Sequence, residues 1–301
     1  MTGYDPAFLD VEVPLPRPRD GRMLRRLEHP HFTVLLDPVR RLAAATAVGI
    51  DGAQLQPLPR TGGWRLDPRA LDSEQTGPEL YRRNTLDRGH LVRRRDPMWG
   101  TPEAAKDAGE ATFVYSNAAP QVGRFNQSKE LWNGLEDHVL TYAQAHERRV
   151  VVLTGPVLAA DDPIYRGIGI PRRFWKIAAW AVARWQMPSG GGPVTQTVGL
   201  AAAAFVLDQT PLLDDAALAQ ATARALAVDD APPLGPFRTF QVPVADVVAL
   251  SGMDFGELAG ADVRPGADAT PSAVPPGPAL PPAPAVPATW TELTGPGDLH
   301  V

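Results

Sequence analysis

Short apolar runs rich in β-branched residues recur along the chain and predict a multi-stranded β-sheet. The first two runs, His31–Asp37 and Ala43–Ile50, are joined by a Pro-containing turn, which predicts an antiparallel hairpin. Further strands are predicted at Thr112–Tyr115, Arg149–Gly155, Phe174–Ala183 and Thr195–Leu207.

Helical spacing of apolar positions is clearest between Asn126 and His146, where one face carries Leu131, Leu135, Val139 and Tyr142. This pattern predicts a long amphipathic helix. Two more helices are predicted at Asp214–Val228, opened by two Asp residues, and at Val244–Leu250, closed by Ser251 and Gly252. Because strands and helices do not alternate strictly, we expect an α+β fold with a central antiparallel sheet flanked by helices.

The pattern divides the chain into a globular domain at 1–262 and a tail at 263–301. The domain begins with an extended, Arg- and Pro-rich segment at 1–26. Between Ala267 and Pro287 the sequence has no aromatic residue and no charge after Asp268, so it cannot bury a core and is predicted to be disordered. The residues after it, from Trp290, form either a docking peptide or a frayed end, of which the frayed end is favoured.

Composition narrows the classes of protein that remain. The chain has 301 residues and no cysteine, which excludes disulfides, thiolate metal sites and a catalytic thiol. It begins without the pattern of a secretory signal and has no apolar run of about 18 residues, so we expect a cytoplasmic protein without a membrane anchor. The formal net charge of -5 means that any contact with nucleic acid depends on a local basic patch.

One such patch lies between Arg82 and Gly100, where six arginines surround His90. A solvated charged surface is the usual explanation of such a run. Gly89, however, permits a close approach of backbone or ligand, and Leu91 and Val92 would hold the strand against a core. Nearby positive charge lowers the pKa of an imidazole, so His90 would remain neutral and available as a base.

A second polar segment, Tyr115–His138, leads into the long predicted helix. Its side chains include several that coordinate or hydrogen-bond through oxygen: Asn117, Gln121, Asn126, Asn133 and Glu136. Taken alone, Asn126 is most simply a helix N-cap.

Four sequence blocks occur together in these two segments. They are LDRGHL at Leu86–Leu91 and, in order within Ser116–Glu136, SNAAPQ, FNQ and WNGLE. In this combination the chain resembles the DNA/RNA non-specific endonuclease family, the ββα-metal nucleases with a DRGH motif that include endonuclease G. The resemblance extends over about Leu27–Asp262 and implies a ββα-metal finger that carries the active site.

The resemblance also implies roles for individual residues. His90 would deprotonate water, Asn126 would bind Mg²⁺ (with Mn²⁺ as a substitute), Glu136 would hold waters of the metal, Arg88 would contact phosphate, and Asn117 would support the site. The family's first arginine precedes a Trp, and here Gly62 occupies that position. Either Arg60 or Arg65 would replace it. The substrate-binding residues are predicted to be Arg60, Arg93 and Arg94.

A metal, a histidine and arginines contact the sugar-phosphate backbone and carry no base code, so we expect cleavage of DNA or RNA with little sequence preference. The resemblance implies 5′-phosphate and 3′-hydroxyl ends and a homodimer. Because such activity must be restrained, we expect a regulated effector of defence or self-killing, with the tail or Arg17–Arg26 contacting a protein partner. The alternative setting is an exported toxin.

Two other classes of protein compete with this interpretation. A nucleic-acid-binding protein on an inactive nuclease scaffold would lack the base or the metal ligand, and both residue types are present. A hydrolase with another nucleophile is disfavoured because the chain has neither a cysteine nor a G-x-S-x-G motif. The other histidines show no metal-ligand spacing.

Overall fold

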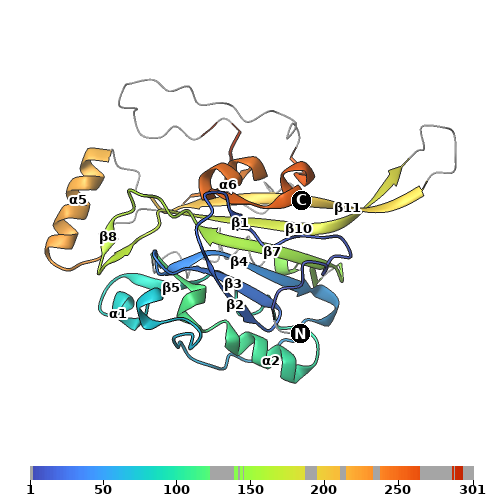
Figure 1. Ribbon diagram of the computed structural model, residues 1–301, viewed down its shortest axis with the longest axis horizontal. Coiled ribbons are helices and arrows are strands. Elements are labelled where there is room, and N and C mark those ends of the chain that lie inside the picture. Colours follow the sequence, from blue (N-terminus) through green and yellow to red (C-terminus); the bar gives the residue numbers. More distant parts are fainter. Residues whose placement is uncertain are drawn as a thin grey trace.

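The computed structural model is centred on an eight-stranded sheet in which every neighbouring pair is antiparallel (Figure 1). Its order is β14-β12-β11-β10-β7-β4-β3-β2. The bounds are β2 Arg25–His29, β3 Phe32–Asp37, β4 Leu42–Asp51, β7 Arg149–Pro156, β10 Arg173–Gln186, β11 Thr195–Asp208, β12 Arg238–Val242 and β14 Thr291–Glu292.

The remaining strands form three two-stranded ribbons: β1 (Arg17–Pro18) with β13 (Met253–Asp254), β5 (Leu86–His90) with β6 (Ala118–Val122), and β8 (Ile164–Tyr165) with β9 (Ile168–Gly169). The α-helices in the described parts are α1 Pro78–Tyr81, α2 Pro102–Ala111, α5 Asp215–Ala227 and α6 Val244–Ser251, and the 3₁₀ helices are η1 Gly52–Gln54, η2 Asp72–Glu74, η3 Tyr115–Asn117 and η4 Gly256–Ala261.

The structure describes residues 3–122, 139–141, 143–144, 146–186, 195–210, 215–232, 238–264, 287 and 289–293. Most of the helix predicted at Asn126–His146 therefore lies outside the described residues, although 139–141 and 143–144 are helical. No helix in the described ranges is long and apolar enough to cross a membrane.

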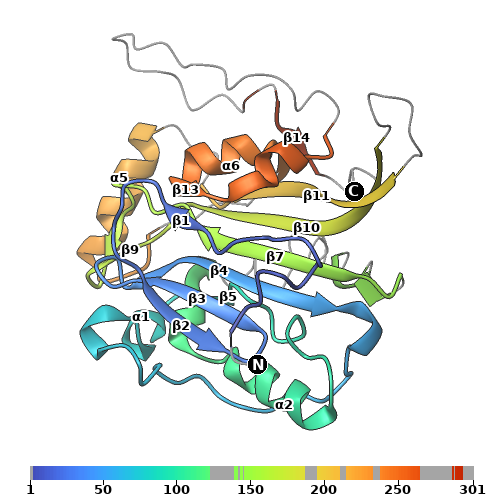
Figure 2. The same cartoon turned by 45° about the vertical axis from the view of Figure 1, so that its right-hand side comes forward.

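A separate apolar core covers each face of the sheet, because side chains alternate between the two faces along a strand. On one face, which we call the helix face, α6 and η4 contact β11, and Val244 and Leu258 are buried. Tyr4 and Phe8 join this core, so the N-terminal segment contributes to packing. On the opposite face, which we call the ribbon face, Leu91 and Ala119 from the region of the β5–β6 ribbon are buried. In Figure 2, α6 lies beside β11, whereas α1 and α2 lie toward β2.

Most of the predicted elements are confirmed. The predicted hairpin is formed by β3 and β4, and three predicted strands correspond to β7, β10 and β11. The helix predicted at Asp214–Val228 is α5, and α6 ends at Gly252, whose φ of 65° is the left-handed conformation that glycine tolerates.

The strand predicted at Thr112–Tyr115 is wrong. Thr112 caps α2, Val114 forms one isolated bridge with Arg65, and Tyr115 begins η3. The apolar side chains of this segment are buried by neighbouring loops, although the segment is not part of a paired strand. Their hydrophobicity therefore indicated burial and did not indicate a β-strand.

The favoured interpretation of the C-terminal residues as a frayed end is also wrong for 289–293. Thr291 and Glu292 form β14 at the edge of the sheet, and Leu293 is buried. This short segment pairs with β12, and composition alone could not reveal that contact. Most of the predicted disordered stretch lies outside the described residues.

Candidate active site

The ribbon of β5 and β6 carries three consecutive residues of the predicted site. Arg88, Gly89 and His90 occupy the end of β5, which pairs in register with β6. The next two residues, Leu91 and Val92, are buried in the core on the ribbon face. This anchor fixes the end of β5 over the central sheet, as the sequence predicts.

Asn117 ties the end of β5 to the residues that precede β6. Its Oδ1 accepts a hydrogen bond from Val92 N at 2.9 Å, while its Nδ2 donates to the carbonyl oxygens of Val92 and Thr112 at 2.9 and 3.0 Å. Its own carbonyl accepts from Leu91 N at 3.0 Å. The side chain is fully buried. Its hydrogen bonds therefore go to backbone groups, which suits a residue that positions the site without touching substrate.

We expect Asn117→Ala to lower the free energy of unfolding by about 3 kcal/mol or more, because each buried polar group left unsatisfied costs about 1–3 kcal/mol. Chemical denaturation measures the loss. Gln56→Ala is the matched control, because the Gln56 amide donates to Gly100 O at 2.9 Å from a half-buried position. An equal loss of stability in the two variants would contradict the role of Asn117 in holding the end of β5.

Gly89 is required by the close approach of β6. A Cβ at this position would lie 2.0 Å from Oε1 and 2.1 Å from Cδ of Gln121. Gln121 is itself buried, so its side chain has little room to move. The glycine of the DRGH motif therefore allows the amide of Gln121 to lie across the strand beside His90.

The imidazole of His90 is held by two aromatic side chains. Its ring centroid lies 4.6 Å from that of Trp64, in a tilted contact, and 5.0 Å from that of Phe113, edge to face. Its Nε2 atom is buried and has no hydrogen-bond partner among the described residues. The packing thus holds the ring and leaves Nε2 without a partner in the described part of the chain.

Electrostatics keep this imidazole neutral. Burial and, to a smaller extent, the positive charges of nearby arginines together lower the pKa of His90 to about 3, with the arginines contributing in the order Arg60, Arg93, Arg94 and Arg88. The arginines near His90 in the sequence predict the direction of this shift, but in the structure desolvation is the larger cause.

Two guanidinium groups flank His90 by stacking on the same two rings. The Cζ atom of Arg88 lies 5.7 Å from the centroid of Trp64, and that of Arg60 lies 4.9 Å from the centroid of Phe113. Both arginines are exposed. A phosphate beside the imidazole would therefore lie near two positive charges.

The other candidate arginines have different neighbours. The guanidinium of Arg65 donates to the Glu110 carbonyl at 3.2 Å, and that of Arg94 donates to the Leu58 and Pro59 carbonyls at 3.2 and 3.1 Å. Arg93 lies close enough to affect the pKa of His90. Between the two residues left open by the sequence, Arg60 is the one placed beside His90.

The backbone explains why no side chain occupies position 62. Gly62 has a φ of +89°, which disfavours any other residue, and a Cβ there would lie 3.3 Å from Cγ of Glu110. Arginine would be strained here. A positive charge at this part of the site must come from elsewhere in the segment, and Arg60 is two residues away.

Sequence reasoning missed the aromatic wall of the site. In the sequence, Trp64 only marked the position of the family's first arginine, and Phe113 was predicted to lie in a strand. In the structure, both rings contact His90. The wall continues through Tyr115, whose ring centroid lies 5.7 Å from that of Trp64, to Tyr81 at 6.0 Å from Tyr115. The available signal was the presence of Phe113 and Tyr115 just before the SNAAPQ block, next to the Trp-containing segment.

The predicted metal ligand Asn126 and the predicted carboxylate Glu136 lie outside the described residues. In the described portion, no group of three or more His, Cys, Asp or Glu residues could hold a metal ion. Mg²⁺ often keeps several waters and few protein ligands, so a metal held by one carboxamide and by phosphate oxygens would not need such a group.

Comparison with protein families and curated proteins places the chain among nucleases. The model of the DNA/RNA non-specific endonuclease family matches residues 20–261. Uncharacterized protein y4fB of Sinorhizobium fredii is 36% identical over 86% of this chain and 40% of its own length. Mitochondrial endonuclease G of Homo sapiens is 31% identical over 32% of this chain and 34% of its own length. The chain thus spans about a third to two fifths of these relatives.

The crystal structure of the EndoG/EndoGI complex shares the fold. The match has a TM-score of 0.51 at 19% sequence identity and covers 79% of this chain and 91% of the other. The predicted α+β architecture is therefore also found in a solved structure.

Proposed function

The chain belongs to the DNA/RNA non-specific endonuclease family, and from this premise we propose that it hydrolyses phosphodiester bonds of DNA or RNA with little sequence preference. The observation that carries the proposal is the geometry around His90: a neutral imidazole with a nitrogen that has no partner among the described residues, near the guanidiniums of Arg60 and Arg88.

His90 acts as the general base in this proposal. Its Nε2 accepts a proton from the water that attacks phosphorus, while Trp64 and Phe113 keep the ring in one orientation. Without substrate the imidazole is a weak base, because burial and positive charge lower its pKa. A phosphodiester anion between the arginines offsets part of that positive field. The base therefore gains strength when the substrate binds.

Arg88 and Arg60 bind the phosphate and offset the negative charge that develops on its oxygens. Arg93 and Arg94 extend the positive field along the nucleic acid. These contacts reach only the backbone of the substrate, which accounts for weak sequence preference. Asn117 contributes indirectly by holding the strand end that carries His90.

As the family resemblance implies, Asn126 would hold the metal and Glu136 would order the waters around it. When bound, Mg²⁺ would neutralise charge on the phosphoryl oxygens and stabilise the departing oxygen. As water attacks phosphorus the bond to the 3′-oxygen breaks, and this oxygen takes a proton from solvent, so the products carry 5′-phosphate and 3′-hydroxyl ends.

Metal removal tests this function directly. We expect the purified chain to nick supercoiled DNA in Mg²⁺ and to lose at least ~10²-fold of its rate in EDTA, because the charge on the transition state is then uncompensated. Excess Mg²⁺ or Mn²⁺ should restore the rate. Single-stranded DNA and RNA in parallel define the range of substrates. Cleavage that persists in EDTA would contradict a metal-dependent mechanism.

The pH dependence of cleavage follows from the pKa of His90. The neutral imidazole is the active form, so lowering its pKa moves the loss of activity to lower pH. We expect kcat/KM, which reports the free enzyme, to stay level from pH 8 down to about pH 5. Initial rates at constant ionic strength check this, and an acid limb near pH 6.5 would contradict it.

The lowered pKa of His90 also makes the stability of the folded chain depend on pH. Between pH 6.5 and about pH 3 the unfolded chain binds a proton at His90 and the folded chain does not, so stability falls as the pH falls through this range. Denaturation measured at each pH separates this effect from the pH dependence of catalysis.

The partners predicted from the sequence remain part of the proposal. A homodimer would give twice the chain mass in light scattering. The EndoG neighbour was solved in a complex with an inhibitor, EndoGI. A protein that restrains this chain would serve the same purpose.

A further inference from the structure

A short C-terminal segment lies against the edge of the sheet, far in sequence from the rest of the domain. Thr291 and Glu292 pair with Gln241 and Phe240 of β12, and Leu293 N donates to Thr239 O at 2.8 Å. Figure 2 shows β14 beside α6. The segment is separated from Arg264 by the Pro- and Ala-rich stretch. The contact is therefore made by a tethered peptide and not by a neighbouring strand of a hairpin.

The segment inserts an apolar side chain on each face of the sheet. On the helix face, the ring centroid of Trp290 lies 5.4 Å from that of Phe240, and its Nε1 donates to Oδ2 of Asp246 at 2.8 Å. On the ribbon face, Leu293 is buried in the core. These two side chains enclose the edge of the sheet and define the register of the peptide.

Charge adds a third point of recognition. Nε of Arg238 donates to Oε1 of Glu292 at 2.7 Å, and its Nη2 contacts the second carboxylate oxygen. The guanidinium also lies over Phe240, with Cζ 4.9 Å from the ring centroid. Both partners are partly exposed, so the pair contributes orientation more than affinity.

Without this segment, β12 would be the edge of the sheet, and its backbone groups would be open to another strand. A two-residue strand makes few contacts and can separate without unfolding the domain. We propose that the edge of β12, with Arg238, Phe240 and Asp246, is a peptide-binding site for an extended Trp-Thr-Glu-Leu sequence, and that Trp290–Leu293 fills it as a detachable ligand. The binding mode is β-strand addition with side-chain pockets.

Binding of the same sequence from solution tests the proposal. The probe is a fluorescent peptide of residues 287–296, and the receptors are the full chain and its Trp290→Ala, Leu293→Ala double variant. A tethered ligand competes at an effective concentration on the order of millimolar. By fluorescence anisotropy we expect the double variant to bind the peptide at least ~10-fold more tightly than the full chain. Equal affinities, or no binding to the double variant, would overturn the proposal.

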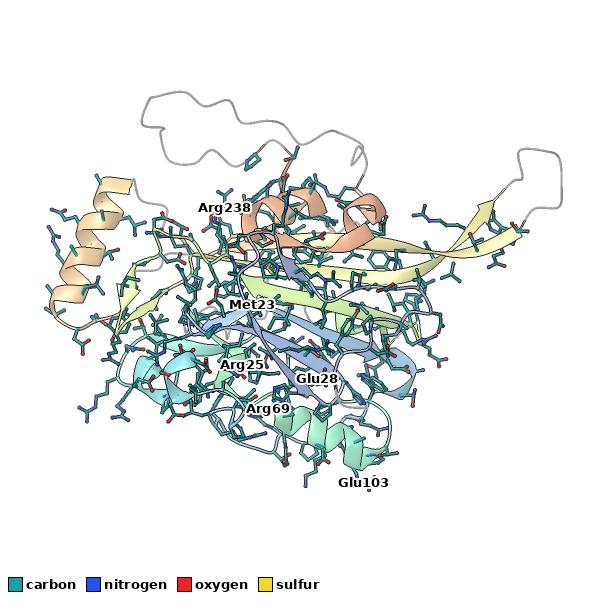
Figure 3. The ribbon with its side chains drawn as sticks, in the orientation of Figure 1. Met23, Arg25, Glu28, Arg69, Glu103 and Arg238 are labelled. Atoms are coloured by element: carbon teal, nitrogen blue, oxygen red, sulfur yellow. The ribbon has the colours of Figure 1, made fainter. Side chains whose placement is uncertain are left out.

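A charge exchange in the intact chain keeps the test decisive if the double variant is poorly folded. Arg238→Glu in the intact chain weakens the contact of the tethered segment through Glu292, so a peptide that carries Glu292→Arg should bind this variant more tightly than the natural peptide does. Arg25→Glu is the matched control, since Arg25 pairs with Glu74 at 2.6 Å and lies in β2 at the opposite edge. Figure 3 shows Arg238 near α6, apart from Arg25. Failure of the exchange, or an equal effect of Arg25→Glu, would also overturn the proposal.

Discussion

His90→Asn is expected to lower kcat/KM for DNA cleavage by about 10²–10⁴-fold, the usual contribution of a positioned general base. Asn is polar and smaller than His, but it cannot accept a proton from water near neutral pH. The flanking arginines remain, so DNA affinity should change by only a few fold. Cleavage rates with excess enzyme, together with a binding isotherm in EDTA, separate the two effects.

His31→Asn is a matched control for this experiment. His31 also stacks on a tryptophan, with ring centroids 3.5 Å apart from Trp99, and its Nδ1 lies 2.7 Å from Pro97 O. Its φ of 67° is one that Asn tolerates. The same chemical change away from the site should leave cleavage nearly unchanged. If His90→Asn kept more than a tenth of the activity, or if both variants lost it equally, His90 would not be the base.

Gly89→Ala is expected to lower activity by about 10²-fold, because a displacement of about 1 Å at a catalytic group has effects of this size. The added methyl group overlaps the side chain of Gln121, so β5 and β6 must separate next to His90. The melting temperature should fall as well. Cleavage rates and thermal unfolding of the same preparations measure the two effects.

The cause can be isolated with a second substitution. Gln121→Ala removes the atoms that the new methyl group meets, so Gly89→Ala should cost much less in a Gln121→Ala background. Gly63→Ala is the matched control, because a Cβ at Gly63 has no heavy atom within 4 Å. Equal losses in both backgrounds would mean that the overlap with Gln121 is not the reason for glycine at position 89.

Several features of the site could be anticipated from the sequence because they depend on neighbouring residues. The order Arg88-Gly89-His90, followed by two apolar residues, predicts a strand end held against a core. The structure has this arrangement, with Leu91 and Val92 buried. Both residues are apolar and lie directly after β5, and large apolar side chains are most often buried, so the local sequence carried the information.

Features that join distant segments could not be anticipated in the same way. The choice between Arg60 and Arg65 depends on which guanidinium lies over Phe113, a residue about 50 positions away. Asn117 also looked like one oxygen donor among several until its bonds to Val92 and Thr112 were seen. Contacts of this kind leave little trace in local periodicity.

By itself, the sequence determined the α+β class, five of the eight strands of the central sheet and the family, because hydrophobic periodicity and four short motifs are local properties. Only the tertiary structure decided that burial, more than charge, keeps His90 neutral, that aromatic rings hold it, and that the C-terminal segment completes the edge of the sheet. Desolvation and packing depend on what surrounds a side chain in space, and the chain order does not specify those neighbours.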